Sequence, residues 1–271
     1  MKFVTERICF AALLLVCSVA ASPPLWPQTD AVASKVKVTD ASAYEVVSIK
    51  PYKSDQGVSS MYSLPDGFRW TNFPVVSLVR AAYGISMDNQ IEGLPGWANS
   101  DPYDFEVKAD EKTTETWKSL SYKERYKKEE PMMQSLLADR CQFKGHVVMR
   151  EMAVYDLVIA KGGLKMKEAA PGEGSSESMG GNKLEARAQS TDAIIGAFQG
   201  VAGRMIVDKT GLAGRKFDFE MTWAEDRRDG TADAGPSIFT VLEEELGVKL
   251  VPGRGPVPVL IIDHIEKPSP N

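Results

Sequence analysis

The sequence predicts an α+β protein made of two similar tandem modules, each a β-α-β-β-α-β-β unit in which small mixed sheets pack on helices. Three observations lead to this prediction. A G-L-x-G turn followed by an alternating strand occurs twice, an apolar helical stretch ended by glycine precedes each turn, and residues further downstream match at a constant offset of 105 positions. Together they indicate an internal duplication.

The turn and the strand after it are the clearest repeated pair. Residues 93–96 precede a strand at 103–107, and residues 211–214 precede a strand at 217–221. Both strands alternate apolar and acidic residues, which predicts one buried and one solvated face. The matches at the offset of 105 are Leu137 with Leu242, Cys141 with Leu246, Phe143 with Val248, Lys144 with Lys249, Val154 with Val259, and Leu157 with Ile262.

Upstream of each turn the pattern predicts a strand and then a helix. The strands are expected at 68–72 and 183–188, and the helices at 74–84 and from 191 to 203. Each helical stretch is apolar and ends at a glycine, which is a common helix stop signal.

The rest of each module is predicted from similar patterns. In the second module a helix at 237–246 carries one apolar stripe, formed by Ile238, Val241, Leu242 and Leu246. The nearly continuous apolar run at 257–262 is typical of a central strand. A strand at 44–51 precedes both modules and is expected to join one of their sheets.

These elements divide the chain into segments. Residues 44–168 form the first module with its N-terminal strand, and residues 183–271 form the second. Between them, residues 169–182 are rich in Gly and Ser and are predicted to be a linker or long loop. A further flexible loop is expected at 230–235.

The N-terminus resembles a targeting segment. Residues 1–21 combine a basic start with a short apolar run at 8–19 and small residues after it, which is typical of a signal peptide. The alternative is an N-terminal anchor, although the run is short for spanning a bilayer. Cleavage after Ala20 or Ala21 would leave a leader, residues 22–43, that is expected to be disordered.

Cysteine usage agrees with export. Removal of the signal peptide takes Cys9 and Cys17 away, so Cys141 remains alone and no internal disulfide forms. Cys141 lies among apolar positions, which favours a buried structural role. Lipidation of Cys17 is a weaker alternative to simple secretion. We therefore expect a periplasmic or extracellular protein.

Charge and hydropathy limit the classes of partner that the protein is expected to bind. The formal net charge is −5 and no concentrated basic block is present, which argues against nucleic acid as a partner. After signal removal no stretch is long and apolar enough to span a membrane. A peptide or an envelope protein is the expected kind of partner, and the oligomeric state is open.

The stretch 207–223, "VDKTGLAGRKFDFEMTW", looks at first like a functional loop. Its glycines lead into a strand, whereas a phosphate-binding loop leads into a helix, so the phosphate interpretation fails. A structural turn is the favoured interpretation and ligand contact is the alternative. The candidate contacts in the stretch are Asp208, Lys209, Thr210, Arg215 and Asp218.

The sequence predicts no catalytic residue, metal site or cofactor. His146 and His264 are the only histidines, and no Cys or His cluster has ligand spacing. Asp263 precedes His264, but neighbouring strand residues point to opposite faces. Asp218 and Glu220 share a strand face, which by default is solvated. His264 is kept as a candidate ligand contact.

Aromatic residues gather around the predicted loops. Such residues serve either as binding anchors or as lids of small cores. They include Trp70, Trp97, Trp117, Trp223, Tyr62, Tyr103 and Tyr122. Trp97 is the candidate ligand contact among them.

Six segments, in order, carry a family resemblance: residues 44–51, 136–140, 155–163, 207–223, 235–240 and 259–268. Together they resemble a large soil-associated acidobacterial family of exported proteins of unknown function. The resemblance implies a secreted or periplasmic domain, sometimes fused to membrane sensor proteins, and supplies no catalytic residues. The element order of each module is also similar to the short N-terminal modules of secretins and TonB-dependent receptors, which bind proteins.

We therefore expect a non-catalytic binding or interaction protein of the sensor or scaffold type. One alternative is a hydrolase that acts on an envelope or extracellular polymer, and another is a structural, oligomerising domain. Convergent polar groups in a deep pocket would favour the hydrolase, whereas an exposed apolar patch or unpaired strand edge would favour binding.

Overall fold

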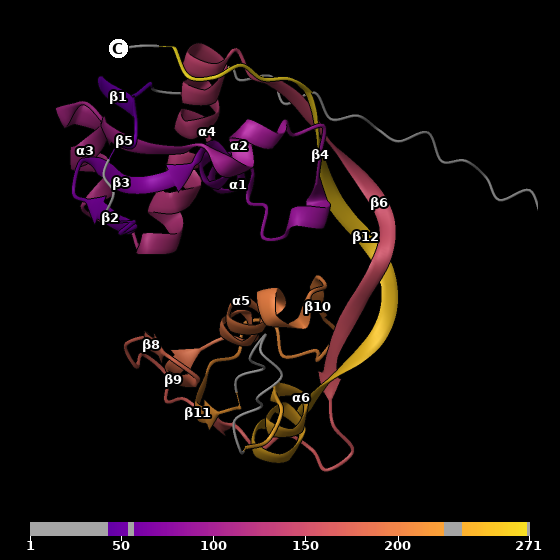
Figure 1. Cartoon of the computed structure of the whole chain (residues 1–271). Coiled ribbons are helices and arrows are strands. Elements are labelled where there is room, and N and C mark those ends of the chain that lie inside the picture. Colours follow the sequence, from indigo (N-terminus) through magenta and orange to yellow (C-terminus); the bar gives the residue numbers. More distant parts are fainter. Residues whose placement is uncertain (1–42, 54–56, 225–234, 270–271) are drawn as a thin grey trace, which may run out of the picture. The chain divides into compact units, whose positions relative to one another are not determined.

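The computed structural model describes residues 43–53, 57–224 and 235–269 (Figure 1). The predicted signal peptide, nearly all of the leader at 22–43 and nearly all of the loop at 230–235 lie outside these residues. Within them, helices and small sheets alternate along the chain, so the predicted α+β class is confirmed.

The first half of the chain contains β1 (Val46–Pro51), β2 (Ser60–Leu64), β3 (Gly67–Pro74), α1 (Val75–Tyr83), a 3-10 turn (Asp88–Gln90), β4 (Ile91–Glu92), α2 (Gly96–Ser100), β5 (Pro102–Lys108), α3 (Glu111–Trp117), α4 (Tyr122–Cys141) and β6 (Lys144–Ile159). The second half contains β7 (Lys167–Glu168), β8 (Ser176–Gly180), β9 (Lys183–Gln189), α5 (Thr191–Ala202), β10 (Ile206–Asp208), β11 (Phe217–Thr222), α6 (Ile238–Val241) with a π-helical continuation (Leu242–Leu246), and β12 (Val248–His264).

Two of the sheets are antiparallel and belong to one half each. Their strand orders are β1-β5-β3-β2 and β7-β11-β9-β8. The predicted linker at 169–182 is wrong in part, because residues 176–180 form β8 and pair with β9 along their whole length. The Gly/Ser composition hid this strand because its side chains are all exposed and it shows no apolar alternation.

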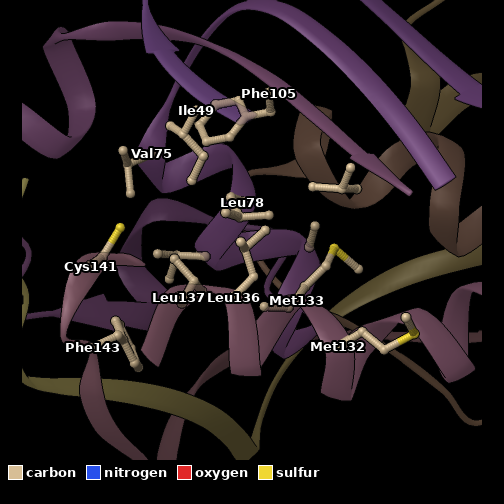
Figure 2. Close-up of a cluster of buried hydrophobic side chains, with 14 of the residues drawn as sticks. Ile49, Val75, Leu78, Phe105, Met132, Met133, Leu136, Leu137, Cys141 and Phe143 are labelled. Atoms are coloured by element: carbon tan, nitrogen blue, oxygen red, sulfur yellow. The ribbon is translucent and has the colours of Figure 1, made fainter. Parts of the chain in front are cut away.

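The first antiparallel sheet packs one face on α1 and α4. Phe105 and Val107 alternate with half-buried residues along β5, as an amphipathic strand requires. Figure 2 shows Ile49 and Phe105 from the sheet together, with Leu78 of α1 between them and the α4 side chains. Cys141, at the end of α4, is buried in this core, as its apolar neighbours predicted, and burial raises the pKa of its thiol to about 12.

The second sheet forms a separate core with α5 and α6. The apolar stripe predicted for the helix at 237–246 is confirmed, because all four of its residues are buried. Ser237 caps α6 by accepting a hydrogen bond from the Thr240 amide, which explains why the helix begins at Ile238.

The third sheet, in the order β10-β6-β12-β4, is the mixed one and joins the two halves. The sequence predicted two short strands at the end of each module, but each pair is one long strand. β6 and β12 run antiparallel from the Lys144–His264 pair to the Ile159–Val248 pair (Figure 1). The short strand β4 of the first half pairs in parallel with β12, and the short strand β10 of the second half pairs in parallel with β6. The last strand of each half therefore pairs with a short strand of the other half.

Apart from α2 and α3, which in the described chain only the first half contains, the two halves share one order of helices and strands: an antiparallel hairpin, a helix, a short strand, a strand, a helix and a long strand. A detail within this order also repeats. Asn72 and Ala188 both have positive φ, 62° and 46°, at an irregularity late in β3 and β9. Their amides donate to Asp104 Oδ1 (3.1 Å) and Asp218 Oδ1 (2.9 Å). These likenesses agree with the duplication hypothesis, which stays a prediction.

This detail corrects the expected solvated face of β11. Glu220 is exposed, but Asp218 is only 9% exposed. The register between β9 and β11 shifts next to Asp218, and this irregularity leaves the Ala188 amide without a partner in the strand pairing. The Asp218 carboxylate accepts a hydrogen bond from that amide instead.

Candidate functional site

The turn at 207–214 is held by its own polar side chains. Asp208 accepts hydrogen bonds from the Thr210 amide (2.8 Å) and hydroxyl (2.7 Å) and from the Thr191 hydroxyl. The Thr210 hydroxyl oxygen in turn accepts from the Leu212 amide (3.1 Å). Asp208 and Thr210 therefore fasten the turn to the start of α5, which agrees with the structural interpretation.

These hydrogen bonds shift the pKa of Asp208. Burial, the largest influence, acts to raise it, but the Thr191 and Thr210 hydrogen bonds together lower it below the ordinary value of 3.8. The resulting stabilisation is present above about pH 4 and is lost as the pH falls through the lowered pKa.

We therefore expect Asp208→Asn to lower the free energy of unfolding by about 1 kcal/mol at pH 7, because a partly solvated site screens the lost charge. Urea unfolding followed by circular dichroism across the acid range measures the difference. It should shrink as the pH falls below 4. An Asp208→Asn effect that is equal at every pH would contradict this origin.

Two further candidates of the same stretch tie it to neighbouring strands. Lys209 Nζ lies 2.8 Å from Asp156 Oδ2 on β6. Arg215 forms a two-point ion pair with Glu168 of β7, at 3.0 and 2.7 Å. Every candidate of the stretch therefore contacts a residue of the protein itself.

The remaining candidates lie apart from this turn. Trp97, on α2, is half-buried against the first core, with Lys267 Nζ 6.0 Å from its ring centroid. His264 is exposed, and its Nε2 lies 3.0 Å from Glu266 Oε1. Asp263, which precedes it, instead lies 3.0 Å from His146 Nδ1. The structure does not gather the predicted site residues into one place.

The described residues contain no group of three His, Cys, Asp or Glu side chains placed to hold a metal ion. In the same part of the chain, no helix is both long and apolar enough to cross a membrane.

The feature that does gather side chains is a hollow of about 610 Å³ in the first half, which we call the β2 hollow. Its floor is the helix-facing side of the β2–β3 hairpin. Met61 pairs with Trp70 and Ser63 pairs with Phe68 in the ladder, so all four line one face.

Two helices form its walls. The α1 wall, completed by the glycine that ends the helix, consists of Ser77, Arg80, Ala81 and Gly84. The α4 wall consists of Tyr122, Tyr126, Glu129 and Met133. Both sets are spaced by three and four residues, which places them on one helix face. The Ser121 capping box with Glu124 starts α4 at Tyr122.

Glu129 and Tyr126 of the α4 wall both have hydrogen-bond partners within the protein. Arg125 Nη2 donates to Glu129 Oε1 (2.9 Å) and to the Gly67 carbonyl (2.9 Å). Burial raises the pKa of Glu129, and Arg125 opposes the shift. The Tyr126 hydroxyl donates to the Ala81 carbonyl (3.1 Å), and burial raises its pKa to about 12.

Two residues that line the β2 hollow are largely exposed. Met61 and Tyr122 are 55% and 72% exposed. Exposed apolar and aromatic side chains beside a hollow are typical of an interaction site.

A second hollow, about 800 Å³, lies along α3 and α4. One of its polar residues, Asp110, caps α3 by accepting a hydrogen bond from the Thr113 amide. Its aromatic residue, Trp117, is buried and lies under Arg125, with Cζ 4.6 Å from the ring centroid.

Sequence analysis found only part of the β2 hollow. Trp70 and Tyr122 were noted as loop aromatics, but Arg80 and Glu129 carried no motif. A signal was present in the spacing of the α4 wall, where two tyrosines, a glutamate and a methionine recur at helical intervals.

Residues 76–265, most of the chain, match the family described as proteins of unknown function, DUF3738. The chain belongs to this family. The match agrees with the expected unknown-function family. No curated protein and no solved structure shows significant similarity to the chain. Membership in the DUF3738 family therefore brings no activity to the β2 hollow, and its chemistry has to be argued from the residues that form it.

Proposed function

We propose that this DUF3738 protein is a non-catalytic binding protein, and that it recruits an extended segment of a partner protein along the outer edge of β2. The observation that carries the proposal is the combination of an apolar hollow with an edge strand beside it. A peptide added to this edge would extend the sheet through main-chain hydrogen bonds and place a side chain in the β2 hollow.

The composition of β2 favours this function over a purely structural edge. Edge strands usually carry charges, proline or bulges that prevent pairing with other chains. Among the outer strands of the two antiparallel sheets in the described chain, β1 carries Lys50, β7 carries Lys167, and β8 carries Glu177. The sequence of β2, Ser-Met-Tyr-Ser-Leu, has no charge. It therefore lacks the usual protection.

The partner class follows from the same features. Main-chain pairing requires an extended polypeptide, and the floor of Met61, Phe68 and Trp70 requires an apolar side chain. A peptide segment of an envelope or extracellular protein fits both requirements. The signal peptide expected at residues 1–21 and the resemblances to exported soil-associated acidobacterial proteins and to secretin and TonB modules support an extracytoplasmic sensor or scaffold.

A peptide selection tests the function. Residues 22–271 would be immobilised and used to select from a displayed library of random linear peptides, and the affinities of selected peptides would be measured by calorimetry. We expect Met61→Lys to weaken binding at least about tenfold, because it places a charge in the apolar floor. Met179→Lys on β8 is the matched control, since Met179 is similarly exposed on an edge strand, and it should leave the affinity unchanged.

Equal effects of the two substitutions, or no selected peptide that depends on Met61, would contradict the proposal. The second of these results, together with a stable dimer in ultracentrifugation, would favour the structural, oligomerising alternative. Hydrolysis of an envelope polymer by the chain, abolished by His264→Ala, would instead favour the hydrolase.

A further inference from the structure

Arg80 is the charged residue of the β2 hollow whose hydrogen-bonding capacity is left unfilled. Its Nε is buried and has no hydrogen-bond partner among the described residues. Its Nη2 contacts the carboxylate of Asp88, but the Asp88 side chain is 87% exposed. An ion pair with so exposed a partner stabilises little, whereas a buried unpaired donor is costly. The Arg80 guanidinium therefore has no buried acceptor among the described residues for its hydrogen bonds.

The other charged residue of the hollow differs from it. Glu129 accepts two hydrogen bonds from Arg125, from Nε at 3.3 Å and from Nη2 at 2.9 Å, and both side chains are largely buried. This pair is electrically balanced and needs no further partner. The charge left to meet a ligand in the β2 hollow is the positive charge of Arg80.

Arg80 is also placed to reach a ligand. Its side chain is 34% exposed and lines the hollow from α1, opposite the apolar floor that Met61 and Trp70 form. A planar guanidinium pairs with a carboxylate through two parallel hydrogen bonds, which a single point charge does not match.

Building on the proposed function, we propose that the β2 hollow recognises a carboxylate of the partner segment and that Arg80 pairs with it, next to the apolar side chain on the floor. The free C-terminus of a protein and the side chain of Asp or Glu both present this group. The site thus selects a peptide with an apolar residue close to a carboxylate.

Matched peptides test this inference. Each selected peptide would be synthesised as the free acid and as the C-terminal amide, and with each Asp or Glu replaced by Asn or Gln. We expect one of these neutralisations to weaken binding about tenfold or more, because a charge-assisted pair is lost. Arg80→Gln should weaken the original peptide by a similar factor and abolish its sensitivity to neutralisation. Arg69→Gln is the control, because Arg69 pairs with Glu106 on the other face of the sheet.

The outcomes separate this inference from the proposed function. Sensitivity to amidation identifies a C-terminus as the source, and sensitivity to an Asp or Glu replacement identifies a side chain. If neutralisation changes nothing while Met61→Lys still abolishes binding, carboxylate recognition is overturned and strand addition stands. If the binding of no selected peptide depends on Met61, both carboxylate recognition and strand addition at β2 are contradicted. Asp88→Asn should tighten binding, because it removes a carboxylate that competes for Arg80. Weaker binding would contradict the pairing of Arg80 with the peptide carboxylate.

Discussion

Neither half of this protein will fold as a monomer when it is produced alone. In the described chain, β6 and β12 pair over their full lengths, and each short strand, β4 or β10, is parallel to the last strand of the opposite half. The cores are shared as well. Leu260 and Ile262 of β12 are buried in the first core, and Leu157 of β6 is buried in the second.

The energetic consequence is large. Each fully buried aliphatic side chain contributes roughly 1.5–3 kcal/mol, against a total stability of about 5–15 kcal/mol for a typical domain. A separated half loses such residues and also exposes a long strand whose main-chain groups have no partner. We expect residues 43–168, which contain the first half together with β7, and residues 169–271 each to lack a cooperative unfolding transition, and their mixture to recover one.

Circular dichroism melts and analytical ultracentrifugation measure this. The control is the intact chain with a protease site in the exposed segment 170–175, cut after folding. It contains the same two pieces and should stay folded and associated. A half that unfolds cooperatively as a monomer would show that the β6–β12 ladder is not required for folding.

The substitution with the largest expected effect on stability is Gly247→Ala. Gly247 follows the π-helical segment with φ at +71°, a conformation that costs an alanine roughly 1–2 kcal/mol. An added Cβ would also overlap the Gly163 carbonyl and lie 2.8 Å from the Lys165 amide. Both groups are backbone, in a loop held by hydrogen bonds from Ala160 to Gly247 (2.9 Å) and from Lys165 to Leu246 (3.0 Å).

Because that loop cannot move without losing these bonds, overpacking adds roughly 1–3 kcal/mol to the backbone cost. We expect Gly247→Ala to lower the unfolding free energy by about 3 kcal/mol or more. Gly203→Ala is the matched control, since Gly203 ends α5 with φ at +65° and has no atom within 4 Å of an added Cβ. It should cost about 1 kcal/mol. Urea denaturation compares the variants, and equal losses would show that the contact with Gly163 is unimportant.

Local physics explains which elements could be read from the sequence. The apolar stripes of α1, α5 and α6 and the glycines that end α1 and α5 are encoded within a few residues of one another. The alternation of β5 and β11 is equally local. The turn at Asp208–Thr210 is local in the same way, because its polar side chains bond to nearby backbone.

Other features depend on partners far along the chain. The composition of residues 176–180 indicated a loop, and only pairing with β9 makes them a strand. Asp218 looked solvated by alternation, and only the shifted register between β9 and β11 buries it against the Ala188 amide. The predicted site residues stayed scattered because sequence proximity and motif likeness do not report which side chains converge in space.

The sequence by itself determined the class of the fold, the burial of Cys141 and the positions of several helices and strands. Those properties follow from periodicity and capping, which act over one or two turns of chain. The tertiary structure alone decided the exchange of last strands between the halves and the assembly of the β2 hollow from β2, β3, α1 and α4. The reason is that backbone pairing and side-chain packing between distant segments depend on register and on three-dimensional neighbours, which no local pattern encodes.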